Sequence, residues 1–154
     1  IPQIASTFVK IHSLGEDTKP LGESQIAMDL ANKSPESWVL KPQREGGGNN
    51  YFDREMNQKL NIMTPSELKA HVLMERIRPR SHSAWLMVQG QSEYTSCVSE
   101  IGRYGVLLAN RGNIELNSDC GYLVRTKSED VNEGGVCAGY SCLNTLFLEE
   151  GEVP

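Results

Sequence analysis

The chain has 154 residues, which is enough for one domain with a sizeable hydrophobic core. Apolar residues make up 38% and charged residues 23%, as in an ordinary globular protein, and no apolar run is long enough to span a membrane. The net charge of −5 argues against nucleic acid as the main partner, although a local cluster of positive charge could still bind a small anion.

The first 42 residues predict two helices and a short strand. The first helix stops at Gly15, and its apolar face consists of Ile4, Phe8 and Ile11. A second helix covers residues 24–33, with an apolar face made of Ile26, Ala27, Leu30 and Ala31. Residues 37–41 predict a strand, which Pro42 closes because proline cannot donate to a sheet ladder.

Two further helices are predicted after a glycine-rich loop that ends at Asn50. Asn50 can cap the first of them, with Asp53 in its first turn, where a carboxylate complements the helix dipole. The buried stripe of this helix consists of Phe52, Met56, Leu60 and Met63. Thr64–Glu67 is a capping box with proline at the first helical position, so a short helix begins there.

The second half of the chain predicts mainly strands. Residues 71–77 form a strand, and residues 79–92 are expected to be an excursion from regular structure. Residues 94–117 predict antiparallel strands, with a first turn at Gly102 and Gly105 and a second turn at Asn110–Asn113. A strand at 121–127 and a second glycine-rich loop at 132–139 follow. Helices and strands alternate early and strands cluster late, so the class is α/β in the broad sense, a mixed α+β fold.

The four cysteines show no C-x-x-C spacing, and the chain has three histidines to assist them; the cysteines are Cys97, Cys120, Cys137 and Cys142. This pattern argues against a zinc site. An even count permits disulfides without demanding them at this length, and we expect four free thiols.

The first glycine-rich loop suits a phosphate group, although it has neither Walker nor dinucleotide-fold spacing. Lys41 ends the preceding strand, where its ammonium can reach a phosphate, and glycines let backbone N–H groups approach anionic oxygens. Glu45 supplies an oxygen ligand of the kind that Mg²⁺ takes beside phosphates. These parts suit phosphoryl transfer, which depends on positioning and charge neutralisation. A flexible turn between strand and helix is the alternative on this stretch alone.

A second cluster of charge precedes the second glycine-rich loop. Arg125 and Lys127 share one strand face, because alternate residues point the same way, and together they suit a carboxylate or a phosphate. A solvated pair on an edge strand is the alternative. Glu100 lies in an apolar stretch and needs a partner, either a ribose hydroxyl or a nearby cation. The strand end at 74–77 could offer backbone groups to an adenine edge, or its Met and Ile could be plain core.

Five blocks, taken together, resemble the C-terminal part of eukaryotic-type glutathione synthetase: "WVLKPQREGGGNN", "LMERI", "VSEIG", "LVRTK" and "GGVCAG". Their order and spacing match as well as their residue types, from about residue 5 to about residue 142. The resemblance implies an ATP-grasp fold, of which residues 1–154 form a C-terminal portion. The nucleotide-binding core would cover residues 35–142, followed by a tail at 143–154.

The resemblance implies an ATP-dependent ligase of glutathione biosynthesis that joins γ-glutamylcysteine to glycine, using ATP and Mg²⁺. The substrate carboxylate becomes an acyl phosphate, and the glycine amine displaces the phosphate. It also implies a cytoplasmic homodimer without nucleic-acid or membrane partners; a secreted location is the alternative. The chain starts at Ile1, midway along the family pattern, so we expect one piece of a longer polypeptide that is accompanied by its N-terminal remainder.

The resemblance assigns roles to the residues at matching positions. Lys41 and Arg125 would be catalytic, Glu45 would hold Mg²⁺, and Arg125, Val136 and Cys137 would contact the peptide substrate. The residues expected to bind ATP are Lys41, Pro42, Gln43, Arg44, Glu45, Gly46, Gly47, Gly48, Asn49, Asn50, Phe52, Met74, Glu75, Arg76, Ile77, Glu100, Lys127 and Glu133.

The sequence departs from the family pattern at a few positions. Phe52 and Asp53 stand where the family usually has Tyr-Gly, Cys137 replaces an alanine of the lid at 134–139, and Glu133 replaces an aspartate. Two functional hypotheses therefore stay open: a working ligase when both pieces are together, and a diverged relative that keeps the fold but has lost or changed the peptide reaction. A third, an isolated structural module, leaves both glycine loops unexplained.

Overall fold

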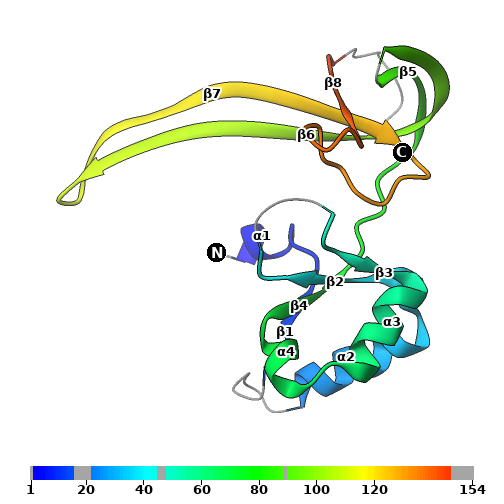
Figure 1. Ribbon diagram of the computed structural model, residues 1–154. Coiled ribbons are helices and arrows are strands. Elements are labelled where there is room, and N and C mark those ends of the chain that lie inside the picture. Colours follow the sequence, from blue (N-terminus) through cyan, green and yellow to red (C-terminus); the bar gives the residue numbers. More distant parts are fainter. Residues whose placement is uncertain (1, 16–21, 45–47, 89, 147–154) are drawn as a thin grey trace. The chain divides into compact units, whose positions relative to one another are not determined.

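The computed structural model describes residues 2–15, 22–44, 48–88 and 90–146, which fall into two compact units. The first unit is Ile1–Arg78 and the second is Pro79–Pro154. Each unit contains one four-stranded antiparallel sheet, and the described helices lie in the first unit (Figure 1). The predicted mixed α+β class is therefore confirmed.

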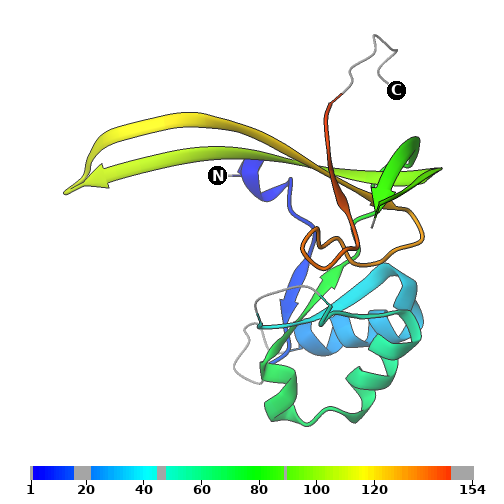
Figure 2. The ribbon, with the colours of Figure 1, turned by 45° about the horizontal axis from the view of Figure 1, so that its top comes forward.

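The first unit packs helices against one face of its sheet (Figures 1 and 2). Its helical segments are α1 (Pro2–Ala5), α2 (Glu23–Lys33), the 3-10 turn η1 (Pro35–Ser37), α3 (Asp53–Ile62) and α4 (Pro65–Lys69). Its strands are β1 (Ile11–Ser13), β2 (Trp38–Pro42), β3 (Tyr51–Phe52) and β4 (His71–Glu75). They lie in the order β1-β4-β2-β3, and every pairing is antiparallel.

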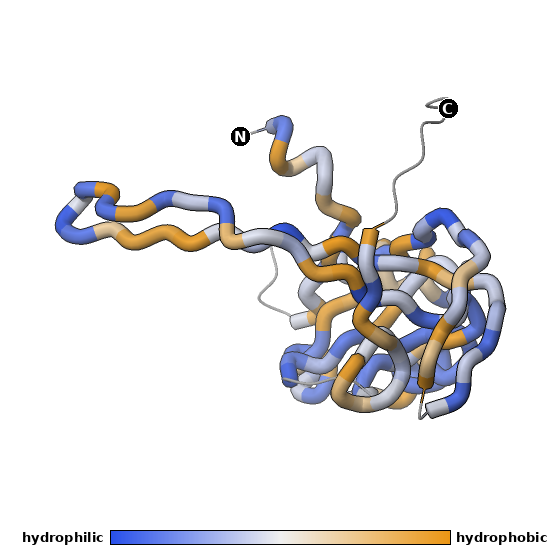
Figure 3. The backbone as a smooth tube through the Cα atoms, turned by 90° about the horizontal axis from the view of Figure 1, so that it is seen from above, coloured by the Kyte–Doolittle hydropathy of each residue, from blue (hydrophilic) through white to orange (hydrophobic). Residues whose placement is uncertain are grey.

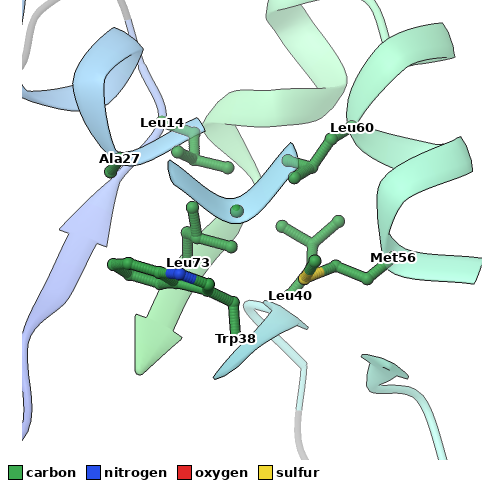
Figure 4. Packing of buried hydrophobic residues seen from close by; sticks show 8 residues of the cluster. Leu14, Ala27, Trp38, Leu40, Met56, Leu60 and Leu73 are labelled. Atoms are coloured by element: carbon green, nitrogen blue, oxygen red, sulfur yellow. The ribbon is translucent and has the colours of Figure 1, made fainter. Parts of the chain in front are cut away.

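The core of the first unit lies between this sheet and its helices (Figure 4). Leu40 and Leu73 are direct partners on β2 and β4, and both are fully buried together with Met56 of α3. Full burial of such a side chain stabilises the folded state by about 1.5–3 kcal/mol relative to leaving it exposed to water. The complete cluster is Leu14, Ala27, Ala31, Trp38, Leu40, Met56, Leu60 and Leu73.

Three of the predicted helices are confirmed, with different apolar contacts from those expected. On α2, Ala27 and Ala31 are buried, whereas Ile26 and Leu30 are exposed. The capping box of α4 is complete: the Thr64 N–H donates to the Glu67 carboxylate at 2.8 Å, and the Glu67 N–H donates to the Thr64 hydroxyl at 3.3 Å. The Thr64 backbone N–H is the main reason that the pKa of Glu67 is lowered.

Two predictions about the helices are wrong. Most of the expected first helix is absent, because α1 ends at Ala5 and Ile11–Ser13 forms a strand on β4. A short helix with an exposed apolar face gains little by itself, whereas β1 gains ladder hydrogen bonds from a distant strand. The predicted cap at Asn50 lies two residues too early, since Phe52 occupies the N-cap of α3 and is half-buried outside the core cluster.

The second unit is one sheet of four strands in chain order: β5 (His82–Val88), β6 (Gln91–Asn110), β7 (Asn113–Ser128) and β8 (Cys142–Asn144). The expected excursion at 79–92 is therefore wrong over β5. There Ala84, Leu86 and Val88 are less exposed than Ser83, Trp85 and Met87, which is the alternation of a half-buried strand.

The predicted turn at Gly102 and Gly105 is also wrong, because β6 continues through both residues. A bulge replaces it: Tyr104 pairs with Gly121 and Gly105 with Asp119, which leaves Cys120 as the extra residue. The predicted turn at Asn110–Asn113 is confirmed, since Arg111 and Gly112 have φ values of 46° and 85°, as a type I′ turn requires.

All four cysteines belong to the second unit and are free thiols, as predicted. Cys97 is buried, Cys142 is half-buried, and Cys120 and Cys137 are exposed. Burial raises the pKa of the Cys97 thiol, so this residue behaves as a small apolar core side chain.

Candidate functional site

In the first unit, several predicted nucleotide-binding residues gather on the sheet face opposite the core. Val39 of β2 pairs directly with Phe52 of β3 and with Met74 of β4. Directly paired residues share a face, and Lys41 lies two residues beyond Val39, so it follows on the same side. We name this surface the outer sheet face and define it by Val39, Lys41, Phe52, Val72 and Met74.

Arg76 extends the outer sheet face through two side-chain contacts. Its guanidinium carbon lies 5.5 Å from the centroid of the Phe52 ring, and its Nη1 lies 3.5 Å from Oδ1 of Asp53. Its backbone N–H donates to the carbonyl of Ser37 at 2.8 Å. Arg76 therefore contacts both Phe52 and Asp53, the two neighbouring positions at which the sequence departs from the pattern of the family that it resembles. This link could not be predicted from the sequence, because it depends on the register of β2, β3 and β4.

The backbone at Asp53 has a conformation that favours glycine, the residue that the family resemblance predicts at this position. Asp53 has φ 49°, in the left-handed region that glycine adopts freely and that aspartate tolerates better than most residues. The ion pair with Arg76 partly offsets this strain. The Asp53 and Arg76 side chains are 49% and 29% exposed, so the pair contributes at most about 1 kcal/mol.

The described ends of the first glycine-rich loop are open to a ligand. The Gln43 N–H donates to the Ala70 carbonyl at 2.7 Å and the Arg44 N–H to the Pro42 carbonyl at 2.8 Å, which fixes the loop's start. Gly48 has φ 83°, and no described atom lies within 4 Å of where its Cβ would be. The predicted Mg²⁺ ligand Glu45 lies outside the described residues, as do Gly46 and Gly47.

Residues 74–77, at the end of β4, lie in two different environments. Met74 and Arg76 belong to the outer sheet face, whereas Glu75 is held by Lys10 through an ion pair of 3.3 Å between Nζ and Oε1. The Glu75 N–H also donates to the Lys10 carbonyl, at 3.0 Å. Ile77 is exposed. The N–H groups of Glu75 and Arg76 are thus already donated within the protein, so an adenine edge would meet other groups of this segment.

In the second unit, Glu100, Arg125 and Lys127 lie on one face of the β6–β7 pair. Glu100 and Arg125 are direct register partners and form an ion pair, and Lys127 follows two residues along β7. The expected need of Glu100 for a partner is met by a cation. The Glu100 and Arg125 side chains are 64% and 38% exposed, so the pair is weak and Arg125 can exchange partners at little cost.

Lys127 connects this face to the second glycine-rich loop. Its ammonium donates to the carbonyls of Val131 and Asn132, the latter at 3.1 Å. A Cβ on Gly134 would lie 3.9 Å from Lys127 Cδ, so the loop passes beside the lysine stem. The buried Oε1 of Glu133 has no hydrogen-bond partner among the described residues. An orphaned carboxylate oxygen of this kind fits a donor supplied by a ligand, such as a ribose hydroxyl.

The other two predicted peptide contacts, Val136 and Cys137, belong to this loop itself. Val136 is half-buried and Cys137 is exposed. The turn that contains them is fixed by two backbone hydrogen bonds, from the Gly139 N–H to the Val136 carbonyl at 3.0 Å and from the Tyr140 N–H to the Gly135 carbonyl at 2.9 Å. Among the described residues, no cluster of three or more His, Cys, Asp and Glu side chains is placed to hold a metal ion. In the same ranges, no helix is both long enough and apolar enough to cross a bilayer.

Comparison with known proteins identifies the family. The family model of the eukaryotic glutathione synthase ATP-binding domain matches residues 1–148. The chain is 35% identical over 150 residues to glutathione synthetase of Xenopus laevis, with 96% of this chain and 31% of the relative covered. It is 38% identical over 149 residues to the Homo sapiens protein, with the same coverage. It is 40% identical over 131 residues to the chloroplastic enzyme of Solanum lycopersicum, with 83% of this chain and 24% of the relative covered.

The solved structures include a similar fold. A glutathione synthetase-like effector from Globodera pallida, in its apo form, matches with a TM-score of 0.51 and 23% identity, over 64% of this chain and 24% of that one. The mixed α+β architecture with antiparallel sheets is of the ATP-grasp type. The chain spans less than a third of the length of the curated relatives described above. It belongs to the family of the ATP-binding domain of eukaryotic glutathione synthase, a family of ATP-dependent ligases.

Proposed function

We propose that this chain supplies the ATP-binding part of a ligase that joins γ-glutamylcysteine to glycine. The observation that carries the proposal is the set of cations beside the two glycine-rich loops, Lys41 in the first unit and Arg125 with Lys127 in the second, within a chain of this family. Because the chain spans 24–31% of its relatives, the proposed enzyme includes a polypeptide corresponding to the rest of their length. Residues 35–142 are its proposed nucleotide-binding core.

Each cation has a separate proposed role. Lys41 binds the ATP phosphates at the start of the first loop, Lys127 binds the nucleotide beside the second loop, and Arg125 binds a carboxylate of γ-glutamylcysteine. All three side chains are half-buried, so their charges are less screened than those of fully solvated side chains. Glu100 holds Arg125 in place until a substrate carboxylate competes for its guanidinium.

The proposed reaction has two steps. A carboxylate oxygen of γ-glutamylcysteine attacks the γ-phosphorus of ATP, which forms an acyl phosphate and releases ADP. The neutral amine of glycine then attacks the acyl carbon and loses one proton to water, the C–O bond to phosphate breaks, and inorganic phosphate leaves. Lys41 and Lys127 favour the first step by neutralising phosphate charge, and Arg125 by orienting the carboxylate. Mg²⁺ held by Glu45 would neutralise further phosphate charge when bound.

The test uses the protein as isolated, together with any polypeptide that accompanies it. Phosphate release from ATP should require both γ-glutamylcysteine and glycine. We expect Arg125→Ala to abolish the stimulation by γ-glutamylcysteine while ATP binding stays near the parent value, and Lys127→Ala to weaken ATP binding itself. Phosphate release that is indifferent to both substrates, or an Arg125→Ala variant that keeps full stimulation, would contradict the proposal.

A second candidate function is a diverged relative that keeps the nucleotide-binding fold and has lost or changed the peptide-ligase activity. Two observations favour it: Phe52 and Asp53 are tied to Arg76 by specific contacts, and the exposed Cys137 stands where the family has alanine. Cys137→Ala separates the two candidates. It should raise kcat/KM for glycine in a hindered ligase, and leave glycine unchanged while impairing another acceptor in a diverged enzyme. A cytoplasmic location and a homodimer belong to the first candidate, and a secreted location to the second.

A further inference from the structure

The hairpin formed by β5 and β6 carries an exposed pair of aromatic side chains (Figure 1). Trp85 and Tyr94 are direct register partners, so their rings lie on the same face of the hairpin. The ring centroids are 5.4 Å apart, and the ring planes are inclined by 54°. The two side chains are 68% and 60% exposed, whereas the buried Leu86 of β5 lies on the opposite face. The second unit therefore presents this pair to solvent.

Uncharged side chains flank the aromatic pair on the same face. Ser83 pairs with Ser96 in the row before it, and Met87 pairs with Ser92 in the row after it; all four are exposed. Figure 3 shows long apolar stretches farther along β6 and β7, whereas tryptophan and tyrosine rank near the middle of its hydropathy scale because each ring carries a polar group. We name this surface the aromatic platform and define it by Ser83, Trp85, Met87, Ser92, Tyr94 and Ser96.

The aromatic platform offers hydrogen-bond donors to a ligand. Within the described ranges, the Trp85 indole N–H and the hydroxyls of Ser83 and Tyr94 have no hydrogen-bond partner. An indole N–H can only donate, and a hydroxyl can donate as well as accept. A fitting ligand therefore combines acceptors with apolar ring surface. Proline-rich segments have this combination, because proline lacks an N–H, the carbonyls of a polyproline II helix stay free, and such segments dock onto aromatic side chains.

One end of the aromatic platform is acidic. The Ser96 hydroxyl donates to the Glu129 carboxylate at 2.7 Å, and the Glu129 N–H donates to the Ser96 carbonyl at 3.0 Å. Glu129 and the adjacent Asp130 are both exposed. Lys127 lies one row beyond Ser96, and its ammonium is held by two backbone carbonyls. A basic residue that follows the prolines of a ligand would therefore meet a carboxylate at this end.

We propose that the aromatic platform binds a proline-rich segment of a partner protein, with a basic residue of that segment paired to Glu129. A proline ring packs against Trp85 and Tyr94, and the N–H and O–H groups of the platform donate to carbonyls of the segment. Two residues of a strand span about 6.8 Å and two residues of a polyproline II helix about 6.2 Å, so the basic residue lies about two positions from the contacting proline. None of these residues belongs to the proposed ligase site, so this proposal and the proposed function can fail separately.

The test uses the protein as isolated, together with any polypeptide that accompanies it, and a fluorescein-labelled oligoproline peptide that ends in two arginines. Fluorescence anisotropy should show saturable binding of this peptide. The same peptide ending in two glutamates should bind at least about threefold more weakly, because the pair with Glu129 is lost. A glycine–serine peptide ending in two arginines should not bind measurably. If the oligoproline peptide does not bind, or if the glycine–serine peptide binds equally well, the proposal is overturned.

Tyr94 and Tyr122 provide a matched pair of variants, because both are tyrosines of the same sheet, 60% and 53% exposed, and Tyr122 lies outside the aromatic platform. Tyr94→Ala should weaken binding at least about tenfold, whereas Tyr122→Ala should keep the parent affinity. Glu129→Gln should remove the preference for arginine over glutamate at the end of the peptide. Circular dichroism checks that each variant is folded. Equal affinities of the two tyrosine variants would overturn the proposal.

Acrylamide quenching of tryptophan fluorescence reports whether the aromatic platform is already occupied. Trp38 is only 5% exposed, so the quenchable signal comes from Trp85. We expect this signal to be quenched in the isolated protein and protected when the oligoproline peptide is added. If Trp85 is shielded before any peptide is added, a second copy of the chain or an accompanying polypeptide occupies the platform, and the proposal is overturned.

Discussion

The two units bury their apolar residues in different ways. In the first unit, helices cover one face of the sheet, and eight apolar residues from both layers form one cluster. In the second unit, the described apolar residues that are buried are Leu86, Cys97 and Val124, although its strands are much longer. A sheet with a covering layer completes its own core, whereas a single sheet leaves its alternate apolar residues for another layer to cover. Strand length is therefore no measure of how much a unit stabilises itself.

The largest expected effect comes from the core of the first unit. Leu73→Ala removes a fully buried side chain and leaves a cavity, which costs about 2–5 kcal/mol. Leu107→Ala in β6 should lower the free energy of unfolding by less than about 0.5 kcal/mol, because that side chain is exposed. Urea unfolding is followed by tryptophan fluorescence in two single-tryptophan backgrounds, in which Trp38 reports the first unit and Trp85 the second. Similar losses for both variants would remove the contrast between the units.

A smaller effect is expected from the cation of the first glycine-rich loop. Charge-assisted hydrogen bonds to phosphate are worth about 1.5–3 kcal/mol, so Lys41→Ala should weaken ATP binding by roughly 10- to 100-fold. The fold should remain intact, because Lys41 lies outside the core cluster. Isothermal titration with ATP and Mg²⁺ measures the affinity, with Lys33→Ala at the exposed end of α2 as the control. Unchanged affinity in the folded Lys41 variant would refute the phosphate role.

The strained backbone at Asp53 gives a smaller effect still. Asp53→Gly removes the strain of φ 49° but also the ion pair with Arg76, so the free energy of unfolding should change by less than about 1 kcal/mol. Asp53→Ala loses the ion pair and keeps the strain, so it should be about 1–2 kcal/mol less stable than the glycine variant. Urea unfolding of both variants tests this order. If the alanine and glycine variants have the same free energy of unfolding, the left-handed conformation at residue 53 does not affect stability.

The smallest effects are pH-dependent and separate for each unit. The Thr64 N–H lowers the pKa of Glu67 in the first unit, and the Gly121 N–H, followed by Arg103, lowers the pKa of Asp119 in the second. A lowered folded-state pKa gives stability that is present above the unfolded pKa and is lost as pH falls through the folded value. Glu67→Gln should therefore flatten the loss of stability of the first unit below about pH 4.5, and leave the second unit unchanged.

The control for the pH effect is Asp119→Asn, which should flatten only the acid response of the second unit. Thermal unfolding of the parent and both variants at several acidic pH values, with separate probes for the two units, measures the effect. A parent protein whose two units lose no stability on acidification would show that neither carboxylate is linked to folding.

The elements that the sequence predicted well are those with local signals. The capping box from Thr64 to Glu67 and the turn at Asn110–Asn113 need only contacts within a few residues. The helices α2 and α3 follow from a 3.6-residue period, and β2 from a short apolar run that proline closes. The family also followed from the sequence, because its motifs are short, specific and in register.

The elements that the sequence missed depend on pairing with distant strands. Ile11–Ser13 has helical spacing, yet it forms β1 because Val72–Met74 offers it a ladder. The pairing of β5 with β6, and the continuation of β6 through two glycines, likewise depend on a neighbouring strand. A helix satisfies its backbone within one segment, whereas a strand does so only against another strand, so its existence is a property of the whole sheet.

In the candidate site, too, some features follow from the sequence and others depend on the pairing of distant strands. The sequence alone determined which residue types could bind a nucleotide, because lysine, arginine and glycine carry that chemistry wherever the chain places them. Tertiary structure decided that Phe52, Met74 and Lys41 share a face, and that Arg125 is the cation that meets Glu100. It also decided that Arg76 joins Phe52 to Asp53. Side-chain chemistry is fixed by the residue, but which side chains are neighbours is fixed by strand register, which is set only when the sheet forms.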